Sequence, residues 1–136
     1  MLLFLLPLKS KKSSQNWGQV ERVLANTLNS ICNQSVDDYQ VIVACHDVPS
    51  IASHYPQVRF IQVDYGPPEG KHYNEGLEDK WRKLRYCMVE AGKLDSDFIM
   101  FVDADDLVHC DLAKQCQRHP KSNGWILNTG YRYRWG

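Results

Sequence analysis

The sequence predicts an α/β fold in which a mostly parallel sheet lies between two layers of helices. Short apolar runs alternate with amphipathic stretches along the 136 residues, and this alternation is typical of strand–helix units. Residues 2–8 form an apolar run without internal alternation, which indicates a strand covered by helices on both faces. A chain of this length has room for one hydrophobic core, so we expect a single domain over residues 1–136.

The first half of the chain predicts two strands joined by a helix. After the first strand, the polar residues 9–16 form a loop. The helix begins at Trp17 with Asn16 as its N-cap, and turn-forming residues at 33–38 end it. Its buried face repeats at helical spacing and comprises Val20, Val23, Leu24, Thr27, Leu28 and Ile31. Residues 40–45 form the second buried strand.

The second half predicts two more strands, a long helix and two shorter elements. Residues 58–63 form the third strand, and the Gly- and Pro-rich residues 64–74 form a loop. A helical stripe then runs as far as Gly92 and comprises Leu77, Trp81, Leu84, Met88 and Val89. The remaining elements are a fourth strand, a short helix and a late strand, at residues 97–102, 107–116 and 125–133.

Bulk composition argues against two classes of partner. Apolar residues make up 43% and charged residues 24% of the chain, and the formal net charge is zero, which argues against nucleic acid. Residues 1–6 are too few to cross a bilayer and lack the basic residues and cleavage site of a signal peptide. We therefore expect no transmembrane segment, and attachment at a membrane surface stays open.

The cysteines indicate a reducing compartment. There are five of them, an odd number, and none forms a Cys-x-x-Cys pair, so we expect reduced core thiols and a cytoplasmic protein. No familiar zinc spacing is matched by His109, Cys110, Cys116 and His119, which favours surface histidines and core thiols over a zinc site.

The acidic turn after the fourth strand is the strongest candidate site. Asp103, Asp105 and Asp106 directly follow the apolar run 98–102. Like charges this close repel one another, so a hard divalent cation is a natural partner. An Asp-x-Asp turn can bind Mn²⁺ or Mg²⁺, which then bridges the two phosphates of a nucleotide diphosphate. The alternative is a solvated acidic loop in which Asp106 caps the next helix.

Other candidates follow the strands or lie on the second long helix. Ligands bind beyond the carboxyl ends of the strands in open parallel sheets, which brings Pro7, Lys9 and Asp47 to the same edge. Asp47 could accept a hydrogen bond from a base or ribose, or be an ordinary turn residue. Most of the cationic side chains at 80–85 are expected to be solvated, and Lys80 is the candidate for phosphate.

In these segments the sequence resembles the family 2 glycosyltransferases, which have the Rossmann-like GT-A fold. Residues 5–9 (Leu-Leu-Pro-Leu-Lys) are similar to the end of their first strand, and residues 23–35 resemble their first helix. Residues 41–47 resemble their second strand, whose terminal Asp contacts the base. Residues 101–106 (Phe-Val-Asp-Ala-Asp-Asp) match the family's strand-plus-Asp-x-Asp signature, which is the most specific part of the resemblance. The resemblance covers nearly the whole chain.

The resemblance implies transfer of a sugar, with inversion, from a nucleotide-diphosphate sugar to a saccharide, lipid or protein acceptor. Mn²⁺ or Mg²⁺ is the implied cofactor. With Lys80 added as the phosphate candidate, the expected donor-binding residues are Pro7, Lys9, Asp47, Lys80 and Asp103. The expected metal ligands are Asp103, Asp105 and Asp106. His46 stands where the family often has a second acid, so the identity of the nucleotide stays open.

Two other functions remain as alternatives. The family's catalytic base and acceptor-binding elements come after the segment that ends here at Gly136, so the sequence resembles the donor-binding half of a truncated transferase. A non-catalytic nucleotide- or partner-binding module is the first alternative. A phosphotransferase with Asp103 as nucleophile fits less well, because haloacid-dehalogenase-like enzymes carry Asp-x-Asp on an early strand and follow it with Thr. Neither a dinucleotide-binding glycine motif nor a Walker loop occurs.

Overall fold

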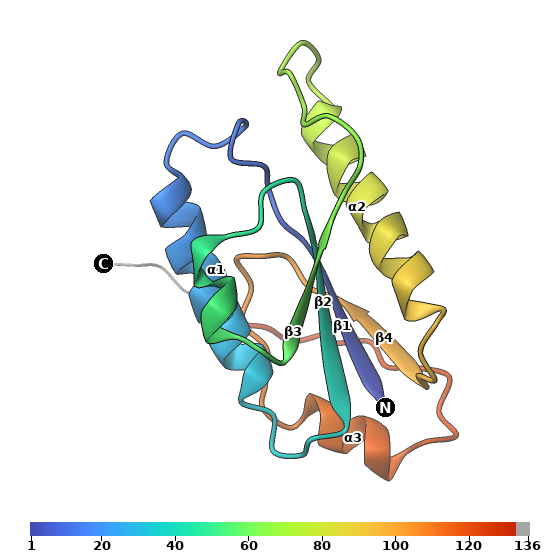
Figure 1. The fold of residues 1–136 in the computed structure, drawn as a ribbon. Coiled ribbons are helices and arrows are strands. Elements are labelled where there is room, and N and C mark those ends of the chain that lie inside the picture. The colour runs from blue at the N-terminus through green and yellow to red at the C-terminus, as the bar shows by residue number, and fades with distance from the viewer. Residues whose placement is uncertain (133–136) are drawn as a thin grey trace.

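The computed structural model describes residues 1–132, and its centre is a four-stranded parallel sheet (Figure 1). The strands lie in the order β3-β2-β1-β4, so β1 is internal and β4 is at an edge. Their bounds are Leu2–Pro7 for β1, Tyr39–Cys45 for β2, Val58–Gln62 for β3 and Phe98–Phe101 for β4. Because all four run in the same direction, their carboxyl ends meet at one edge of the sheet.

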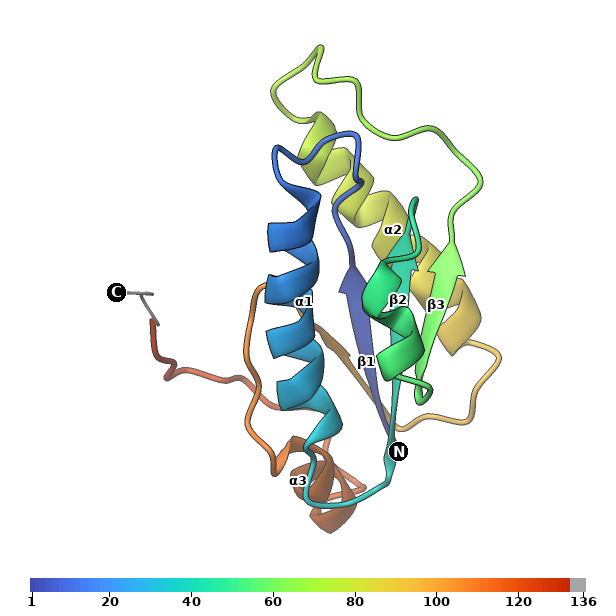
Figure 2. The same ribbon diagram turned by 60° about the vertical axis from the view of Figure 1, so that its left-hand side comes forward.

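One long helix covers each face of this sheet, which gives three layers (Figure 2). α1 (Trp17–Cys32) lies on one face and α2 (Glu75–Ala91) lies on the other. The predicted three-layer α/β fold is therefore confirmed. A short 3₁₀ helix, η1 (Ser50–His54), which the sequence does not predict, joins β2 to β3. None of the helices in residues 1–132 is both long and apolar enough to cross a membrane.

The core follows from the uninterrupted apolar composition of β1. Side chains alternate between the faces of a strand, so an unbroken apolar run supplies both layers. Phe4 and Leu6 pack with α1 on one face, whereas Leu3 and Leu5 pack with α2 on the other. Residues 2–6 are at most 3% exposed, which explains why this strand shows no hydrophobic alternation.

α1 begins where the sequence predicts. Asn16 has an extended backbone, with φ −141° and ψ 99°, and its Oδ1 accepts a hydrogen bond from Gln19 N at 3.0 Å. This N-cap satisfies one of the amide groups that the first turn of a helix leaves unpaired. The helix ends at Cys32, and Asn33 follows it as the C-cap residue.

The helix expected at 107–116 begins later in the structure, as α3 (Leu112–Arg118). The residues before it hydrogen-bond to α1 and to the turn that follows α1. Val108 N donates to Ser30 Oγ at 3.1 Å, for example. The predicted start was wrong because tertiary contacts hold 107–111 as a connection along α1.

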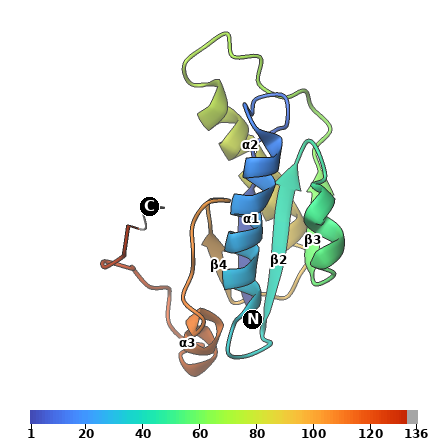
Figure 3. The ribbon, with the colours of Figure 1, turned by 90° about the vertical axis from the view of Figure 1, so that its left-hand side faces the viewer.

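The late strand expected at 125–133 is missing from the part of the chain that the structure describes. Residues 121–132 form no helix or strand, so the prediction was wrong for 125–132, and Tyr133 lies outside the described residues. A strand needs a neighbour for its backbone groups, and residues 125–132 make no backbone hydrogen bond to β4. Their contact with β4 joins the rings of Trp125 and Phe98, whose centroids are 4.7 Å apart. Figure 3 shows the segment running clear of the sheet.

Candidate functional site

A pocket of about 1010 Å³ opens at the carboxyl edge of the sheet. Its walls are the loop after β1 and the loop before α2, which lie at the same end of the sheet in Figure 1. α2, the first turns of α1 and the turn after β4 complete the lining. Both signs of charge are present among the lining side chains, which include Lys9, Lys12, Lys80, Lys83, Asp103 and Asp105.

The pocket brings together site residues that are distant in the sequence. The sequence-predicted residues that line it are Pro7, Lys9, Lys80, Asp103 and Asp105. They come from the end of β1 and the loop after it, from α2 and from the turn after β4, as expected if a ligand binds beyond the carboxyl ends of the strands. The two other predicted residues, Asp47 and Asp106, do not line the pocket.

Lys80 and Asp103 form an ion pair across the lining of this pocket. Lys80 Nζ lies 2.6 Å from Asp103 Oδ1 and 2.8 Å from Oδ2, so the ammonium faces both carboxylate oxygens. The two side chains are 37% and 45% exposed. An ion pair this exposed contributes at most about 1 kcal/mol to stability, so both groups can change partners at low cost.

Hydrogen bonds fix the backbone of the acidic turn. Asp106 N donates to Asp103 O at 3.0 Å and closes the turn. Thr27 Oγ1, on α1, donates to Ala104 O at 3.1 Å and ties the turn to the neighbouring layer. Partial desolvation raises the pKa of Asp106, and the charges of Asp105 and Asp103 raise it further. The three carboxylates therefore repel one another at a fixed place in the fold.

The donor set of the turn fits a divalent cation that also binds a substrate. Asp103 and Asp105 both line the pocket. Mg²⁺ and similar hard cations are commonly bound by one or two carboxylates, with phosphate and water completing the coordination. The oxygens of Asp103, Asp105 and Asp106 do not gather into one three-ligand cluster, so the two pocket residues are the better-placed pair. Coordination by Asp106 stays a prediction.

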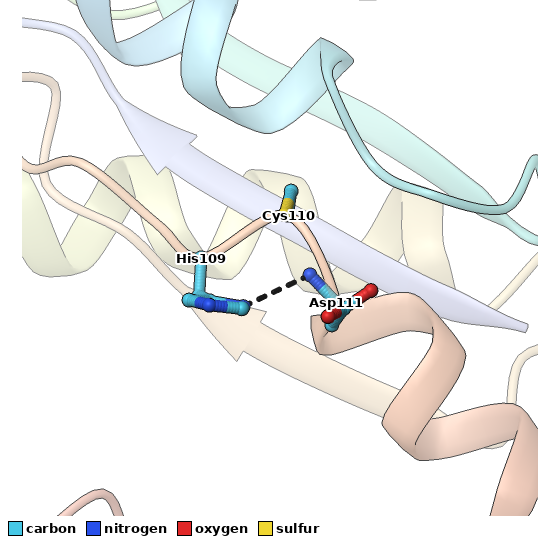
Figure 4. A group of neighbouring side chains, drawn as sticks. All are labelled: His109, Cys110 and Asp111. Carbon is cyan, nitrogen blue, oxygen red and sulfur yellow. Dashed lines mark hydrogen bonds between the residues drawn. The ribbon is translucent and has the colours of Figure 1, made fainter.

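His109, Cys110 and Asp111 are the one group of three metal-binding residue types whose ligand atoms gather within residues 1–132 (Figure 4). Their ligand atoms all lie within 4.8 Å of one another. His109 Nδ1, however, accepts a hydrogen bond from Asp111 N at 3.1 Å, and Asp111 Oδ1 accepts one from Ser35 Oγ at 2.6 Å. These contacts are those of a turn leading into α3, so we assign the group a structural role.

Asp47 holds the loop that forms one wall of the pocket. Its Oδ2 accepts a hydrogen bond from Lys11 N at 2.9 Å, which joins the end of β2 to the loop after β1. Within that loop Ser10 is fully buried, and its Oγ accepts a hydrogen bond from Ser13 N at 3.1 Å. The loop is therefore folded on itself and anchored by Asp47. The predicted contact of Asp47 with a base or ribose stays a prediction.

Glu75, at the start of α2, organises the opposite wall. Its carboxylate accepts backbone hydrogen bonds from Glu69 at 2.9 Å, from Gly70 at 2.7 Å and from His72 at 2.9 Å. Gly70 has φ +76°, a conformation that favours glycine and allows the loop to turn back on the carboxylate. Sequence reasoning missed this role, although an acid directly after a Gly- and Pro-rich loop is a visible signal.

A buried ion pair lies beside the exposed one. Lys83 Nζ is 2.5 Å from Asp79 Oδ2, and the residues are 1% and 8% exposed, although both line the pocket. Tyr65 Oη donates to Asp79 Oδ1 at 3.1 Å, and His46 Nε2 lies 3.8 Å from the same oxygen. Sequence reasoning treated Lys83 as one of several solvated charges. The Asp–Lys spacing of four residues was the available signal, since these positions are neighbours on a helix.

The fold belongs to a class that includes a glycosyltransferase. The chain is similar in structure to S. aureus TarS 1-349, which is a glycosyltransferase, with a TM-score of 0.54 and 15% sequence identity. The match covers 86% of this chain and 31% of the TarS chain. At this identity the likeness shows a glycosyltransferase-like fold and no specific family.

Comparisons of sequence give no further assignment. No protein-family model matches the chain. No curated protein matches it either. The fold and the pocket are therefore the observations on which a function can be argued.

Proposed function

We propose that this chain binds a nucleoside-diphosphate sugar together with Mn²⁺ or Mg²⁺, as the donor-binding part of a glycosyltransferase. The overall reaction would be transfer of the sugar to a saccharide, lipid or protein acceptor, with inversion. Similarity in fold to TarS supports the class of reaction. The charged pocket at the carboxyl edge of the sheet supports the class of ligand.

The observation that carries the proposal is the Lys80–Asp103 ion pair inside that pocket. A metal–diphosphate ligand needs carboxylate oxygens for the cation and an ammonium group for the phosphates. Here the Asp103 carboxylate and the Lys80 ammonium group are 2.6 Å apart, and Asp105 and Lys9 add a further carboxylate and a further ammonium group to the lining. The pocket, at about 1010 Å³, is also large enough for a nucleotide sugar.

Each side chain has a distinct task in this proposal. Asp103 and Asp105 hold the cation, which when bound neutralises charge on the diphosphate leaving group. Lys80 moves from Asp103 to a phosphate oxygen, a small displacement because its Nζ already faces the pocket. Lys9 adds positive charge from the opposite wall. Pro7 lines the pocket where β1 ends and limits the space available to the donor.

A non-catalytic nucleotide-binding module is the second candidate, and one observation favours it. Transfer to an acceptor needs a general base that takes the acceptor proton. Three other carboxylates line the pocket, and each has partners: Glu75 accepts three backbone hydrogen bonds, Asp79 is paired with Lys83, and Glu69 is paired with Lys71. The buried pairing of Asp79 and the three bonds of Glu75 disfavour these two acids as that base. In this alternative the chain binds the nucleotide without transferring the sugar.

The test is calorimetric titration of UDP and of GDP, with and without Mn²⁺. We expect one of the nucleotides to bind only when the metal is present. Asp105→Ala should weaken that binding by at least about tenfold, because removal of a metal ligand costs at least as much as the loss of its outer-shell support. Asp95→Ala is the matched control, because Asp95 is an exposed acid on the turn that leads into β4, outside the pocket lining.

Two outcomes would contradict the proposal. Absence of binding for both nucleotides under every metal condition would mean that the acidic turn is structural. Binding that Asp105→Ala leaves unchanged would place the metal elsewhere.

Formation of a covalent aspartyl-phosphate at Asp103 on incubation with a phosphate donor would instead support a phosphotransferase. Transfer of labelled sugar to a mixture of acceptors separates the transferase from the non-catalytic module.

A further inference from the structure

The buried pair Lys83–Asp79 has no part in the metal and phosphate binding described above. Both residues line the pocket, yet they are only 1% and 8% exposed, so they belong to its deepest part. Burying an ion pair is costly, and replacing such a pair by apolar residues is often neutral or stabilising. Stability alone is therefore a weak explanation for charges at this place.

Lys83 has unused hydrogen-bonding capacity. An ammonium group carries three donors and no acceptor. Within residues 1–132, Asp79 is the hydrogen-bond partner of the Lys83 side chain, through one bond of 2.5 Å. Buried donors without partners cost free energy unless a ligand or water fills them. A ligand in the pocket that presents an acceptor atom to Lys83 would remove this cost.

The position of the pair relative to the acidic turn suggests which part of a donor it meets. His46, which follows β2, lies 3.8 Å from Asp79 through its Nε2, so the pair lies on the β2 side of α2. Lys80 reaches Asp103 after β4. β1 lies between β2 and β4, so Asp79 contacts a residue on one side of β1 and Lys80 contacts a residue on the other side. A nucleoside diphosphate also has polar groups at two separated ends, its phosphates and its base.

We propose that Lys83 and Asp79 bind the hydrogen-bonding edge of the nucleobase, and that this edge carries a carbonyl group next to a ring N–H, as in uracil and guanine. Lys83 donates to the carbonyl oxygen, and Asp79 accepts from the N–H group. A carboxylate has about four lone-pair sites, so Asp79 can accept this bond and keep Lys83 and Tyr65 as partners. This inference rests on the proposed donor-binding function.

Two neighbouring aromatic side chains hold the pair in place. Tyr65 Oη donates to Asp79 Oδ1 at 3.1 Å, and the Arg82 guanidinium lies 3.7 Å from the centre of the Tyr65 ring. His46 packs edge-on against Tyr65, with ring centroids 5.0 Å apart. Burial, followed by the charge of Lys83, lowers the pKa of His46 and favours its neutral form. A neutral His46 leaves Lys83 as the buried cation that Asp79 balances.

The experiment compares nucleotides with pyrophosphate, which has no base. UDP, GDP, ADP and pyrophosphate are titrated with Mn²⁺ into the wild type, Lys83→Met and Lys80→Met. We expect Lys83→Met to weaken binding of the preferred nucleotide by about tenfold or more, and to change pyrophosphate binding by less than about twofold. Lys80→Met should weaken nucleotide and pyrophosphate alike. ADP should bind the wild type more weakly than the preferred nucleotide.

Lys83→Met leaves the buried Asp79 carboxylate without the cation that balances its charge. Removing one partner of a buried ion pair is generally destabilising. The double variant Asp79→Asn/Lys83→Met removes both charges, and it is expected to fold and to show the same selective loss of nucleotide binding. Circular dichroism and thermal melting check the fold of each variant. If the folded variants bind nucleotides like the wild type, the inference is overturned. Equal binding of ADP overturns the choice of a base with a carbonyl edge.

Failure of the donor site itself would give a different result. In that case the wild type binds neither a nucleotide nor pyrophosphate with Mn²⁺. This result would contradict both the donor site and the base-binding role of Lys83 and Asp79. Selective loss in Lys83→Met, by contrast, requires an intact metal–phosphate site. The same set of titrations therefore separates the two failures.

Discussion

Lys80 on α2 and Asp103 after β4 form an ion pair at the carboxyl edge of the sheet, with 2.6 Å between Nζ and Oδ1. The two residues come from different elements, so the pair forms only when α2 packs on the sheet face formed by β1 and β2. In the proposed function a metal–diphosphate ligand separates them, since the carboxylate binds the cation and the ammonium binds a phosphate. Without a ligand, each neutralises part of the other's charge.

Replacing Lys80 by methionine tests the phosphate role. Lys80→Met should weaken Mn²⁺-dependent nucleotide binding by about tenfold, because one charge-assisted hydrogen bond is lost. The free energy of unfolding should change by less than about 1 kcal/mol, since the ion pair is half exposed. Calorimetry and urea unfolding measure the two effects. Lys93→Met, which removes an exposed partner of Glu90 beyond the end of α2, is the control and should leave binding unchanged.

Asn16→Ala tests the start of α1. The side chain of Asn16 accepts a hydrogen bond from Gln19 N at 3.0 Å, and loss of such an N-cap costs about 1 kcal/mol of the free energy of unfolding. Asn16→Asp should retain most of that stability, because a carboxylate also accepts the bond and favours the positive end of the helix dipole. Urea unfolding of the three proteins measures this. Equal stability of Asn16→Ala and the wild type would mean that the cap contributes nothing.

Much of the fold could be predicted because local signals and tertiary structure agree. The apolar run of β1 is buried on both faces, and Asn16 begins α1 where the hydrophobic period changes. The failures lie where long-range contacts decide. Residues 107–111 hydrogen-bond to α1 and its C-terminal turn, which delays the start of α3. Residues 125–132 have a strand-like pattern but no hydrogen-bonded partner strand in the described part of the chain, and a pattern alone does not provide one.

The site could be located from the sequence only in part. The rule that parallel strands end at one edge correctly brought Pro7, Lys9 and Asp105 into a common pocket, but it also selected Asp47, which lies outside the lining. It could not show which charges on α2 are buried, because that depends on how the helix lies over the sheet. Lys83 is 1% exposed and Lys80 is partly exposed, although both are lysines on the same helix. The hydrogen bonds by which Glu75 folds the loop before α2 were also missed, although the position of this acid directly after a Gly- and Pro-rich loop is a signal for them.

Asp106→Asn tests the electrostatics of the acidic turn. Partial desolvation and then the charges of Asp105 and Asp103 raise the pKa of Asp106 above its ordinary value of 3.8. Between these two values the folded chain binds more protons than the unfolded chain, so stability falls as the pH rises through this window. The penalty is fully present above the raised pKa. In metal-free buffer, Asp106→Asn should therefore be more stable than the wild type near pH ~7.

The difference between Asp106→Asn and the wild type should vanish near pH ~3, where the carboxyl group is protonated in both states. Urea unfolding at the two pH values measures it. Asp95→Asn, at an exposed position outside the acidic turn, is the control and should not change stability at either pH. A stability gain for Asp106→Asn that persists in acid would show that repulsion at the turn is not the cause.

Glu75→Gln tests the wall of the pocket before α2. Burial alone would raise the pKa of Glu75, but the backbone N–H groups of Gly70, His72 and Glu69 together lower it below 4.5. The stability that these bonds provide is present above the ordinary pKa and is lost as the pH falls through the lowered value. A neutral amide offers one accepting oxygen in place of a carboxylate's two. Glu75→Gln should therefore loosen the loop at 69–72.

Hydrogen exchange measures this loosening directly. Amides at 69–72 should exchange faster in Glu75→Gln than in the wild type at neutral pH, whereas the amides of β1 should be unchanged. Glu78→Gln alters an exposed acid one turn further along α2 and should leave the loop as it is. Because this loop also lines the pocket, faster exchange should be accompanied by weaker nucleotide binding. Faster exchange with unchanged nucleotide affinity would show that the loop is a wall the ligand does not touch.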